Sequence, residues 1–290
     1  MENQYLKRAL DEYDEAIRVN PKFSAAYYNR GVIYSHLGQF EKAIQDYDNA
    51  IRLNPLLADA YINRGWVFHK LGQTERAIQD YNEAIYLAPN DAEAYYNRGL
   101  VYDDLGQFER AIKDYDEAIR LSPQFADTYV NRGRDYFEMG LTKLAIKDYN
   151  TAISRNPNIA EAYYNRGIAF CKLHRYELAI QDYDEAIRID PMFTDTYYNR
   201  GWAHCKLHQY AQAIKDFDNA IRLNPQFTEA YVGRGRGYFR LYLFEQAIKD
   251  LDQAIKINPE LTEAYFNRAL VYRMLGKRAE VRQDKNHAKE

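Results

Sequence analysis

Apolar residues recur along the chain at intervals that place them on one face of an α-helix. In residues 92–125, for example, Tyr95, Gly99 and Tyr102 lie three or four positions apart. Gly106 follows and interrupts the pattern. A glycine that follows a helix readily adopts the left-handed conformation, so this residue predicts the end of a first helix.

A second helical pattern follows within the same stretch. Ala111, Tyr115, Ala118 and Ile119 again share one face, and Pro123 comes four residues after the last of them. Proline cannot continue a helix interior, so it ends the second helix. The stretch therefore predicts two helices joined by a short turn, and its small residues mark where the two helices approach closely.

The two-helix unit returns every 34 residues, and all eight prolines of the chain follow this period: Pro21, Pro55, Pro89, Pro123, Pro157, Pro191, Pro225 and Pro259. A fixed period of this length predicts a quasi-linear array rather than two globular domains. Below, the positions of a repeat are numbered 1 to 34, with residue 24 at position 1 of the first full repeat. Seven full repeats are predicted, at residues 24–57, 58–91, 92–125, 126–159, 160–193, 194–227 and 228–261. Residues 1–23 supply a lone second helix, and residues 262–290 form a degenerate repeat with a polar, helix-prone end suited to a solvating cap.

The repeat reads Y-x2-R-G-x2-Y, then A-x3-Y, then P. It resembles the tetratricopeptide repeat, whose pattern is W-x2-L-G-x2-Y, A-x3-F and P with the same period. The main departure is the arginine at position 7, where the family usually has leucine. The resemblance covers nearly the whole chain and implies an all-α, right-handed superhelical α-solenoid, with residues 1–290 as one domain. It also implies that the first helices line a concave groove in which ligands bind.

The arginine at position 7 has a candidate partner at position 23, on the face of the second helix that packs against the first. Arginine offers a planar fork that suits a carboxylate, so we expect ion pairs within each repeat. An anion-binding arginine ladder is the alternative. The expected pairs are Arg30 with Asp46, Arg64 with Asp80, Arg98 with Asp114, Arg132 with Asp148, Arg166 with Asp182, Arg200 with Asp216, Arg234 with Asp250, and Arg268 with Asp284. The lone N-terminal helix has no such arginine and carries Glu12 at this position instead.

Position 6 carries an asparagine in seven first helices: Asn29, Asn63, Asn97, Asn131, Asn165, Asn199 and Asn267. A primary amide offers both a donor and an acceptor, which matches the peptide group of an extended ligand. The row resembles the asparagine ladder in the superhelix of the O-linked N-acetylglucosamine transferase, a relative within the family. Peptide binding is therefore one hypothesis, and a structural bond between neighbouring repeats is the other.

Other positions of the groove supply candidate contacts for a partner. Aromatic anchors are expected at Tyr28, Tyr96, Tyr164, Tyr198, Trp66 and Trp202, with Arg134 and Arg236 beside them. Position 2 is acidic from Asp59 to Glu263, which either contributes to the groove or stabilises the helix dipole. Position 13 includes Lys70, Lys172, Lys206 and Arg240. Lysines at positions 2 and 5, which clamp terminal carboxylates in some family members, are missing.

Composition narrows the class of partner. The net charge of −3 does not favour nucleic acid or an anionic membrane, both of which attract basic surfaces. No apolar run approaches the length of a membrane span, and the polar N-terminus is not a secretory signal. Cys171 and Cys205 occupy equivalent places in adjacent repeats, too far apart for a disulfide, so free thiols in the reducing cytoplasm are expected.

Metal binding and catalysis find little support in the sequence. The segments around Cys171 and Cys205 bring histidine near cysteine, as zinc sites do. However, His174 and His208 stand at position 15, where other repeats have glycine, so drift between repeats is the preferred interpretation. The GRGRG run at 233–237 falls inside a helix rather than between a strand and a helix, and is not a phosphate-binding loop. No cofactor, metal or catalytic residue is predicted.

The prediction is a non-enzymatic scaffold that binds a peptide segment of a partner protein in its groove. A structural array that self-assembles is the alternative, because residues 4–18 present an apolar face that no preceding helix covers. This alternative predicts weak homo-oligomers through residues 4–18. RNA binding is a third hypothesis, disfavoured by the acidic position 2, and the array could also serve as the interaction module of a larger complex or enzyme.

Overall fold

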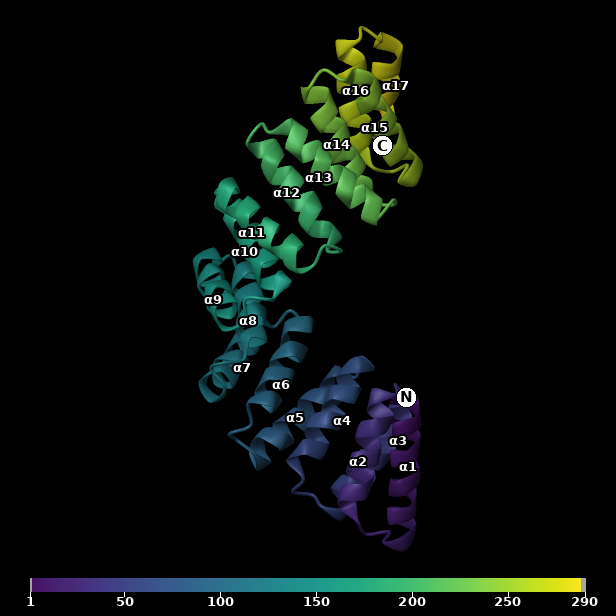
Figure 1. Ribbon diagram of the computed structural model, residues 1–290, viewed down its shortest axis with the longest axis vertical. Helices are drawn as coiled ribbons and strands as arrows, with labels where there is room; N and C mark the ends of the chain where they lie inside the picture. Colours follow the sequence, from purple (N-terminus) through teal and green to yellow (C-terminus); the bar gives the residue numbers. More distant parts are fainter. Residues whose placement is uncertain (1, 288–290) are drawn as a thin grey trace. The chain divides into compact units, whose positions relative to one another are not determined.

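The computed structural model describes residues 2–287, which form seventeen α-helices and contain no strand (Figure 1). The predicted all-α fold is confirmed, and the helices follow the 34-residue period. The chain divides into two compact units, Met1–Leu141 and Thr142–Glu290, and each is described by itself. The single domain and the right-handed superhelix stay predictions.

Each repeat begins with a first helix of 13 residues, from position 1 to position 13. These helices are α2 (Ser24–His36), α4 (Ala58–Lys70), α6 (Ala92–Asp104), α8 (Ala126–Glu138), α10 (Ala160–Lys172), α12 (Thr194–Lys206), α14 (Thr228–Arg240) and α16 (Thr262–Met274).

The second helix of a full repeat has 14 residues and packs against the first helix. These helices are α3 (Phe40–Leu53), α5 (Thr74–Leu87), α7 (Phe108–Leu121), α9 (Thr142–Arg155), α11 (Tyr176–Ile189), α13 (Tyr210–Leu223) and α15 (Phe244–Ile257). The lone N-terminal helix α1 (Glu2–Val19) and the final α17 (Arg278–His287) have the same place in the period.

The turn inside each repeat depends on a left-handed residue at position 15. Gly106 has a φ of 67°, and its N–H donates to the Asp103 carbonyl, which closes the end of α6. His174, His208 and Tyr242 adopt the same conformation, with φ between 58° and 61°. The histidines therefore replace glycine in a turn, as the interpretation of repeat drift expected.

The core of a repeat is an aromatic ring between two helices. Tyr115 of α7 is fully buried against Gly99 of α6, and a Cβ added to Gly99 would lie 2.6 Å from the ring. Ala111 and Ala118 are buried on either side of this tyrosine along α7. The small residues expected from the sequence thus let the two helices approach across the ring.

Within each unit the first helices lie closer together than the second helices. In the N-terminal unit α2, α4, α6 and α8 contact one another in sequence, whereas no pair of described second helices is in contact. The same holds for α10 to α16 in the C-terminal unit. Each unit therefore bends with its first helices on the inner side. We call the surface formed there by positions 2, 5, 6, 9, 12 and 13 the first-helix face.

Candidate functional site

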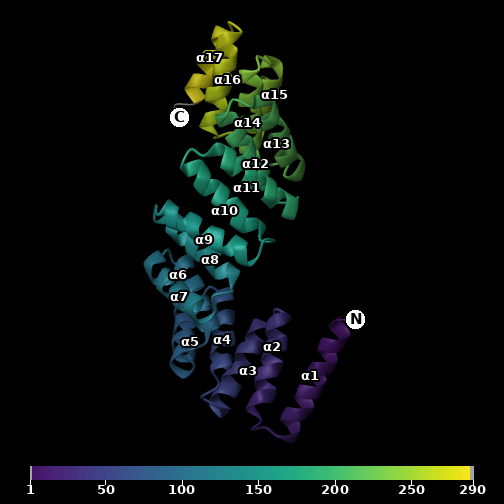
Figure 2. The same cartoon turned by 60° about the vertical axis from the view of Figure 1, so that its left-hand side comes forward.

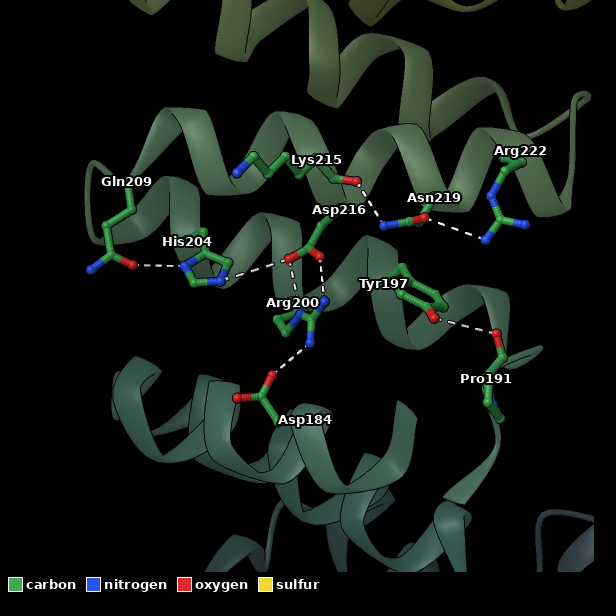
Figure 3. A network of polar contacts seen from close by, with 10 residues as sticks. All are labelled: Asp184, Pro191, Tyr197, Arg200, His204, Gln209, Lys215, Asp216, Asn219 and Arg222. Atoms are coloured by element: carbon green, nitrogen blue, oxygen red, sulfur yellow. Dashed lines mark hydrogen bonds and ion pairs between the residues drawn. The ribbon is translucent and has the colours of Figure 1, made fainter. Parts of the chain in front are cut away.

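The arginine at position 7 holds the carboxylate at position 23 with two parallel hydrogen bonds. In the sixth repeat, Arg200 of α12 donates from Nε and Nη2 to Asp216 of α13 over 3.0 and 2.5 Å (Figure 3). Seven of the eight expected pairs have this geometry, from Arg30–Asp46 to Arg268–Asp284. Arg132 and Asp148 belong to different units, so their pairing stays a prediction.

The same arginine also reaches the preceding repeat, which the sequence analysis missed. Arg200 Nη1 lies 2.5 Å from Asp184 at position 25 of α11 (Figure 3). Position 25 is Asp or Asn in all eight second helices that precede an arginine: Asp14, Asp48, Asn82, Asp116, Asn150, Asp184, Asp218 and Asp252. In each case its side-chain oxygen accepts from the arginine. The arginine therefore links two repeats, and the lone α1 takes part through Asp14.

Burial makes these pairs sensitive to the loss of one partner. The Asp216 side chain is only 5% exposed, and burial raises its pKa although Arg200 opposes this. Burial acts to lower the pKa of Arg200, but its hydrogen bonds to Asp216 and Asp184 leave that pKa raised. The carboxylate thus depends on the guanidinium for its charged form, while the guanidinium stays charged. These contacts occupy the arginine, so it is not free to bind an external anion.

His204 extends this network in the sixth repeat. It stands at position 11, where the other repeats have tyrosine or phenylalanine, and its ring lies between Gln209 and Asp216 (Figure 3). Nδ1 is 2.6 Å from the Gln209 amide oxygen, and Nε2 is 3.7 Å from Asp216. An imidazole therefore replaces a phenyl or phenol ring here and adds a polar contact to the same carboxylate.

The asparagines at position 6 bond to the neighbouring repeat where a tyrosine is available. Asn63, Asn131 and Asn199 each donate from Nδ2 to the hydroxyl of the tyrosine 35 residues earlier, over 3.0 Å. The acceptors are Tyr28, Tyr96 and Tyr164. Among the described residues, no hydrogen bond reaches the amide oxygens of these three asparagines. The amide nitrogen thus has a structural role, and the oxygen remains available on the first-helix face.

The other asparagines differ because their neighbours differ. Asn97 is buried, and its side chain acts to lower the pKa of the nearby Glu93. Position 5 of the repeat before it is Ile62, so no tyrosine is available there. Nδ2 of Asn165 is buried and has no hydrogen-bond partner among the described residues. Asn267 donates back to the Glu263 carbonyl, and Asn29 belongs to the first of the first helices. The predicted ladder is therefore not uniform.

The candidate aromatic anchors are half-buried rather than free. Tyr28, Tyr96 and Tyr164 pack against the core tyrosine of their own repeat, with ring centroids 6.1 to 6.2 Å apart. Burial raises the pKa of Tyr164 to about 12, although the hydrogen bond from Asn199 opposes this. These rings contribute a wall to the first-helix face more than a projecting side chain.

The two tryptophans at position 9 are also partly exposed, and each lies beneath a lysine. Lys70 Nζ lies 5.3 Å from the Trp66 ring, and Lys206 Nζ lies 4.6 Å from the Trp202 ring. Such contacts hold the lysine at the rim of the face. The two arginines at this position are neutralised locally, since Arg134 pairs with Asp103 and Arg236 with Glu263.

Asp135 of α8 is a buried acid that the sequence analysis did not single out. It is fully buried at position 10, where other repeats have valine, alanine, isoleucine or glycine. Neither of its carboxylate oxygens has a donor among the described residues. Burial, followed by the nearby Asp103 carboxylate, raises the pKa of Asp135 to about 8. At neutral pH it is therefore a neutral acid that can donate to Asp103.

The remaining candidate chemistry is sparse. Cys171 and Cys205 are free thiols, and burial raises the pKa of both. Within residues 2–287 no group of three or more His, Cys, Asp or Glu side chains is arranged to hold a metal ion. None of the helices in this part of the chain combines the length and apolarity needed to cross a membrane.

Family comparison agrees with this architecture. Family models described as tetratricopeptide repeat match residues 24–55, 92–125, 160–193 and 194–227, and also residues 46–79. A model described as TPR repeat matches residues 65–105, 133–173 and 244–276. The chain belongs to the tetratricopeptide repeat family. Arrays of this family are typically non-enzymatic scaffolds, which supports a role in protein interaction.

Solved structures with the same fold include several tetratricopeptide proteins. MamA is 26% identical with a TM-score of 0.54, over 56% of this chain and 95% of MamA. YrrB, described as a TPR protein with an unusual peptide-binding site, is 24% identical with a TM-score of 0.56, over 63% of this chain and 95% of YrrB. A tetratricopeptide protein from Parabacteroides merdae is 20% identical with a TM-score of 0.62, over 86% of this chain and 98% of its own. Curated proteins yield no significant sequence match.

Proposed function

We propose that the chain is a non-enzymatic scaffold that binds an extended peptide segment of a partner protein on its first-helix face. The observation that carries this proposal is the amide of Asn63 and of Asn131, two residues of the N-terminal unit in which only the nitrogen is hydrogen-bonded. A tyrosine of the preceding repeat accepts from each nitrogen, and each oxygen is left without a donor among the described residues. A row of fixed acceptors suits the N–H groups of an extended backbone, whatever its side chains.

A role in peptide binding also explains why asparagine recurs at position 6 in seven first helices. A structural bond to tyrosine needs only the amide nitrogen, which many polar residues could replace. Binding a peptide in addition needs an acceptor on the same side chain, and a primary amide provides both. Holding the amide beforehand lowers the entropy lost when a peptide binds. Structural and functional roles are therefore combined in one residue.

A pair of matched variants separates the two roles. Asn63→Ala/Asn131→Ala removes the acceptors, whereas Tyr28→Phe/Tyr96→Phe keeps them and removes the hydroxyls that accept from the amide nitrogens. Partners would be captured from lysate with wild-type protein, and the affinity of peptides from those partners measured by fluorescence anisotropy. Two lost hydrogen bonds of about 1 kcal/mol each should raise Kd about ten-fold or more.

The tyrosine variant should keep its affinity within about three-fold, since a shift of about 0.5 kcal/mol corresponds to that range. Circular dichroism would establish that both variants fold. Equal binding by wild type and the alanine variant would show that the asparagines are architecture only, and would move the search to other surfaces. The same partners should define the cellular location, for which the cytoplasm stays our expectation.

Self-assembly through α1 is the second candidate function, and a specific observation favours it. Helix α1 contacts only α2 among the described helices (Figure 2). Tyr5 on α1 is 74% exposed. Leu6 and Leu10 are only partly covered. A second copy of the chain could cover this face without using the first-helix face.

A further inference from the structure

Helix α14 departs from every other first helix at position 6, where Gly233 replaces asparagine. None of the family matches includes residues 228–243, which contain this helix. The change affects the preceding repeat, because Tyr198 stands where Tyr164 accepts a hydrogen bond from Asn199. With glycine at 233, the Tyr198 hydroxyl has no such donor among the described residues.

A cavity of about 260 Å³ opens at this place between α12 and α14. Tyr198, Trp202 and Val232 form apolar walls, and Gly233 contributes bare backbone. The volume lies just below the range of about 300 to 1,000 Å³ for sites that hold a drug-sized ligand. It therefore suits one large side chain of a peptide rather than a whole small molecule.

A second departure from the repeat, Phe217, accompanies Gly233 and also lines the cavity. Phe217 replaces the core tyrosine of the other full repeats up to this point, and a Cβ added to Gly233 would lie 2.7 Å from its ring. One repeat earlier, Tyr183 and Asn199 occupy the same two positions. The tyrosine-to-phenylalanine and asparagine-to-glycine changes are therefore sterically matched, and together they form the cavity, which we call the Gly233 pocket.

Charges at the rim distinguish the two ends of the pocket. Lys206 and Arg240 lie at the C-terminal ends of α12 and α14, and neither forms an ion pair with a described residue. Glu229 lies near the N-terminal end of α14, and Arg236 is paired with Glu263 over 3.0 Å. Unpaired positive charge is thus concentrated at one edge, directly beside the Trp202 ring.

We propose that the Gly233 pocket binds an aromatic side chain of a partner peptide in which the neighbouring residues are acidic. This proposal rests on the peptide-binding function proposed above and adds a specificity to it. The aromatic ring packs between Tyr198 and Trp202. The acidic neighbours pair with Lys206 and Arg240, and a backbone N–H of the peptide donates to the Tyr198 hydroxyl in place of the missing asparagine.

The decisive variant is Phe217→Tyr/Gly233→Asn, which copies the arrangement of Tyr183 and Asn199 and closes the pocket. Its fold is expected to persist because the same pair of residues already occurs in the preceding repeat. A second variant, Lys206→Glu/Arg240→Glu, keeps the pocket open and reverses the charge of its rim. Both substitutions lie on exposed ends of helices, so this variant stays informative if the first one fails to fold.

Binding would be measured with three short blocked peptides on the full chain. The first has a central phenylalanine flanked by aspartates, the second has alanine in place of phenylalanine, and the third has lysines in place of the aspartates. Only two tryptophans are present, so the indole N–H resonance of Trp202 can be assigned with a Trp202→Phe sample and then reports on the pocket. Anisotropy of labelled peptides reports binding anywhere on the chain.

The first peptide is expected to bind at least ten-fold more tightly than the other two and to shift the Trp202 resonance. Both effects should disappear in Phe217→Tyr/Gly233→Asn, and the charge reversal should weaken binding by at least ten-fold. Binding of the first peptide without a Trp202 shift would overturn the pocket while leaving a peptide-binding groove intact. No preference for the first peptide would also overturn it, as would a Trp202 shift that depends on protein concentration alone, which would identify a second copy as the occupant. The ladder variants test the proposed function separately, because their asparagines do not line this pocket.

Discussion

At the scale of the residue, the arginine at position 7 donates to two side chains: the carboxylate at position 23 of its own repeat, and the Asp or Asn at position 25 of the preceding repeat. Arg98 holds Asp114 of its own repeat with Nε and Nη2, and reaches Asn82 of the preceding repeat with Nη1. The first contact is buried and needs a charged acceptor, whereas the second is exposed and accepts either Asp or Asn across the array. A fork with five N–H donors can meet both demands, and a lysine cannot.

This difference predicts how variants of the network behave. Arg98→Leu leaves the buried Asp114 without its cation and should lower the free energy of unfolding by about 3 kcal/mol. Asn82→Asp should change it by less than about 1 kcal/mol, because Arg64 already pairs with Asp48 in that way. Chemical denaturation followed by circular dichroism measures both. Similar stability of wild type and Arg98→Leu would contradict the structural role of the pair.

Asp135 shows the opposite case of a buried acid without a cation of its own. Its neighbours are Asp103 on α6 and Arg134 and Glu138 on α8, and Arg134 is already paired with Asp103. An aspartate in the unfolded chain has a pKa of about 3.9, whereas that of Asp135 in the folded chain is about 8. Between these values the folded protein binds one more proton than the unfolded protein.

Stability should therefore fall as the pH rises from about 4 to about 8, with a slope of at most about 1.4 kcal/mol per pH unit. Asp135→Asn removes this titration, so the variant should show a flatter profile and exceed wild type in melting temperature at pH 9. Glu109→Gln, at an exposed position of the same unit, serves as the control and should follow wild type. Parallel profiles for wild type and Asp135→Asn would show that Asp135 is ionised in the fold.

At the scale of the helix pair, stability depends on the match between position 8 and position 24. Gly99 faces the rigid ring of Tyr115, while Gly235 faces the flexible Leu251, whose nearest atom would lie 3.1 Å from an added Cβ. The degenerate last repeat carries both changes at once, since Ala269 occurs together with Lys285 in place of the ring. The small residue is thus required by its partner rather than by the helix.

Gly99→Ala should consequently destabilise the protein by about 1 to 3 kcal/mol through overpacking. Gly235→Ala should be nearly neutral, since a small shift of Leu251 is offset by a gain in helix propensity of about 1 kcal/mol. Melting temperatures of the two variants provide the comparison. A larger loss for Gly235→Ala than for Gly99→Ala would refute this account of the packing.

The helix pairs were largely predictable from the sequence because the same pattern of apolar, small and turn residues recurs in every repeat. The period placed the helices, and left-handed residues such as Gly106 placed the turns. The partner of Arg200 within its repeat was found at Asp216, since both residues recur together. These are local features, and eight copies of each separate the requirement of the fold from the drift of a single residue.

Contacts between repeats were harder to predict, because they require knowledge of which positions meet when repeats stack. The bond of Arg200 to Asp184 was missed. A bond from the asparagine to a neighbouring repeat was one of two hypotheses, but its partner, Tyr164 for Asn199, was not named. Position 25 offered a signal, since it is Asp or Asn throughout. Asp135 and Gly233 offered a different one, because each breaks the pattern at its position. Residues that differ from the other repeats at their position therefore indicate candidate functional sites, whereas the residues common to all repeats indicate what the fold requires.

At the scale of the whole array, the two ends differ in their polarity. Helix α17 is mostly polar, and it buries Asp284 against Arg268. Helix α1 keeps Asp14 for Arg30, so it is joined to the array by the same bridge as any second helix. Among the described helices it contacts only α2, and the apolar side chains of Tyr5, Leu6 and Leu10 are at least partly exposed.

The partly exposed apolar side chains of α1 favour association with a second copy of the chain. Leu6→Glu/Leu10→Glu places charge on this face and should abolish the association, whereas Glu12→Gln/Glu15→Gln, on exposed positions of the same helix, should leave it unchanged. Sedimentation equilibrium over a range of concentrations would measure it, with wild type expected to gain mass as its concentration rises. The variant of Gly233 and Phe217 should associate like wild type, because its substitutions lie far from α1 along the chain. A wild-type protein that stays monomeric at high concentration would leave α1 with the role of a cap, and the first-helix face as the surface on which partners bind.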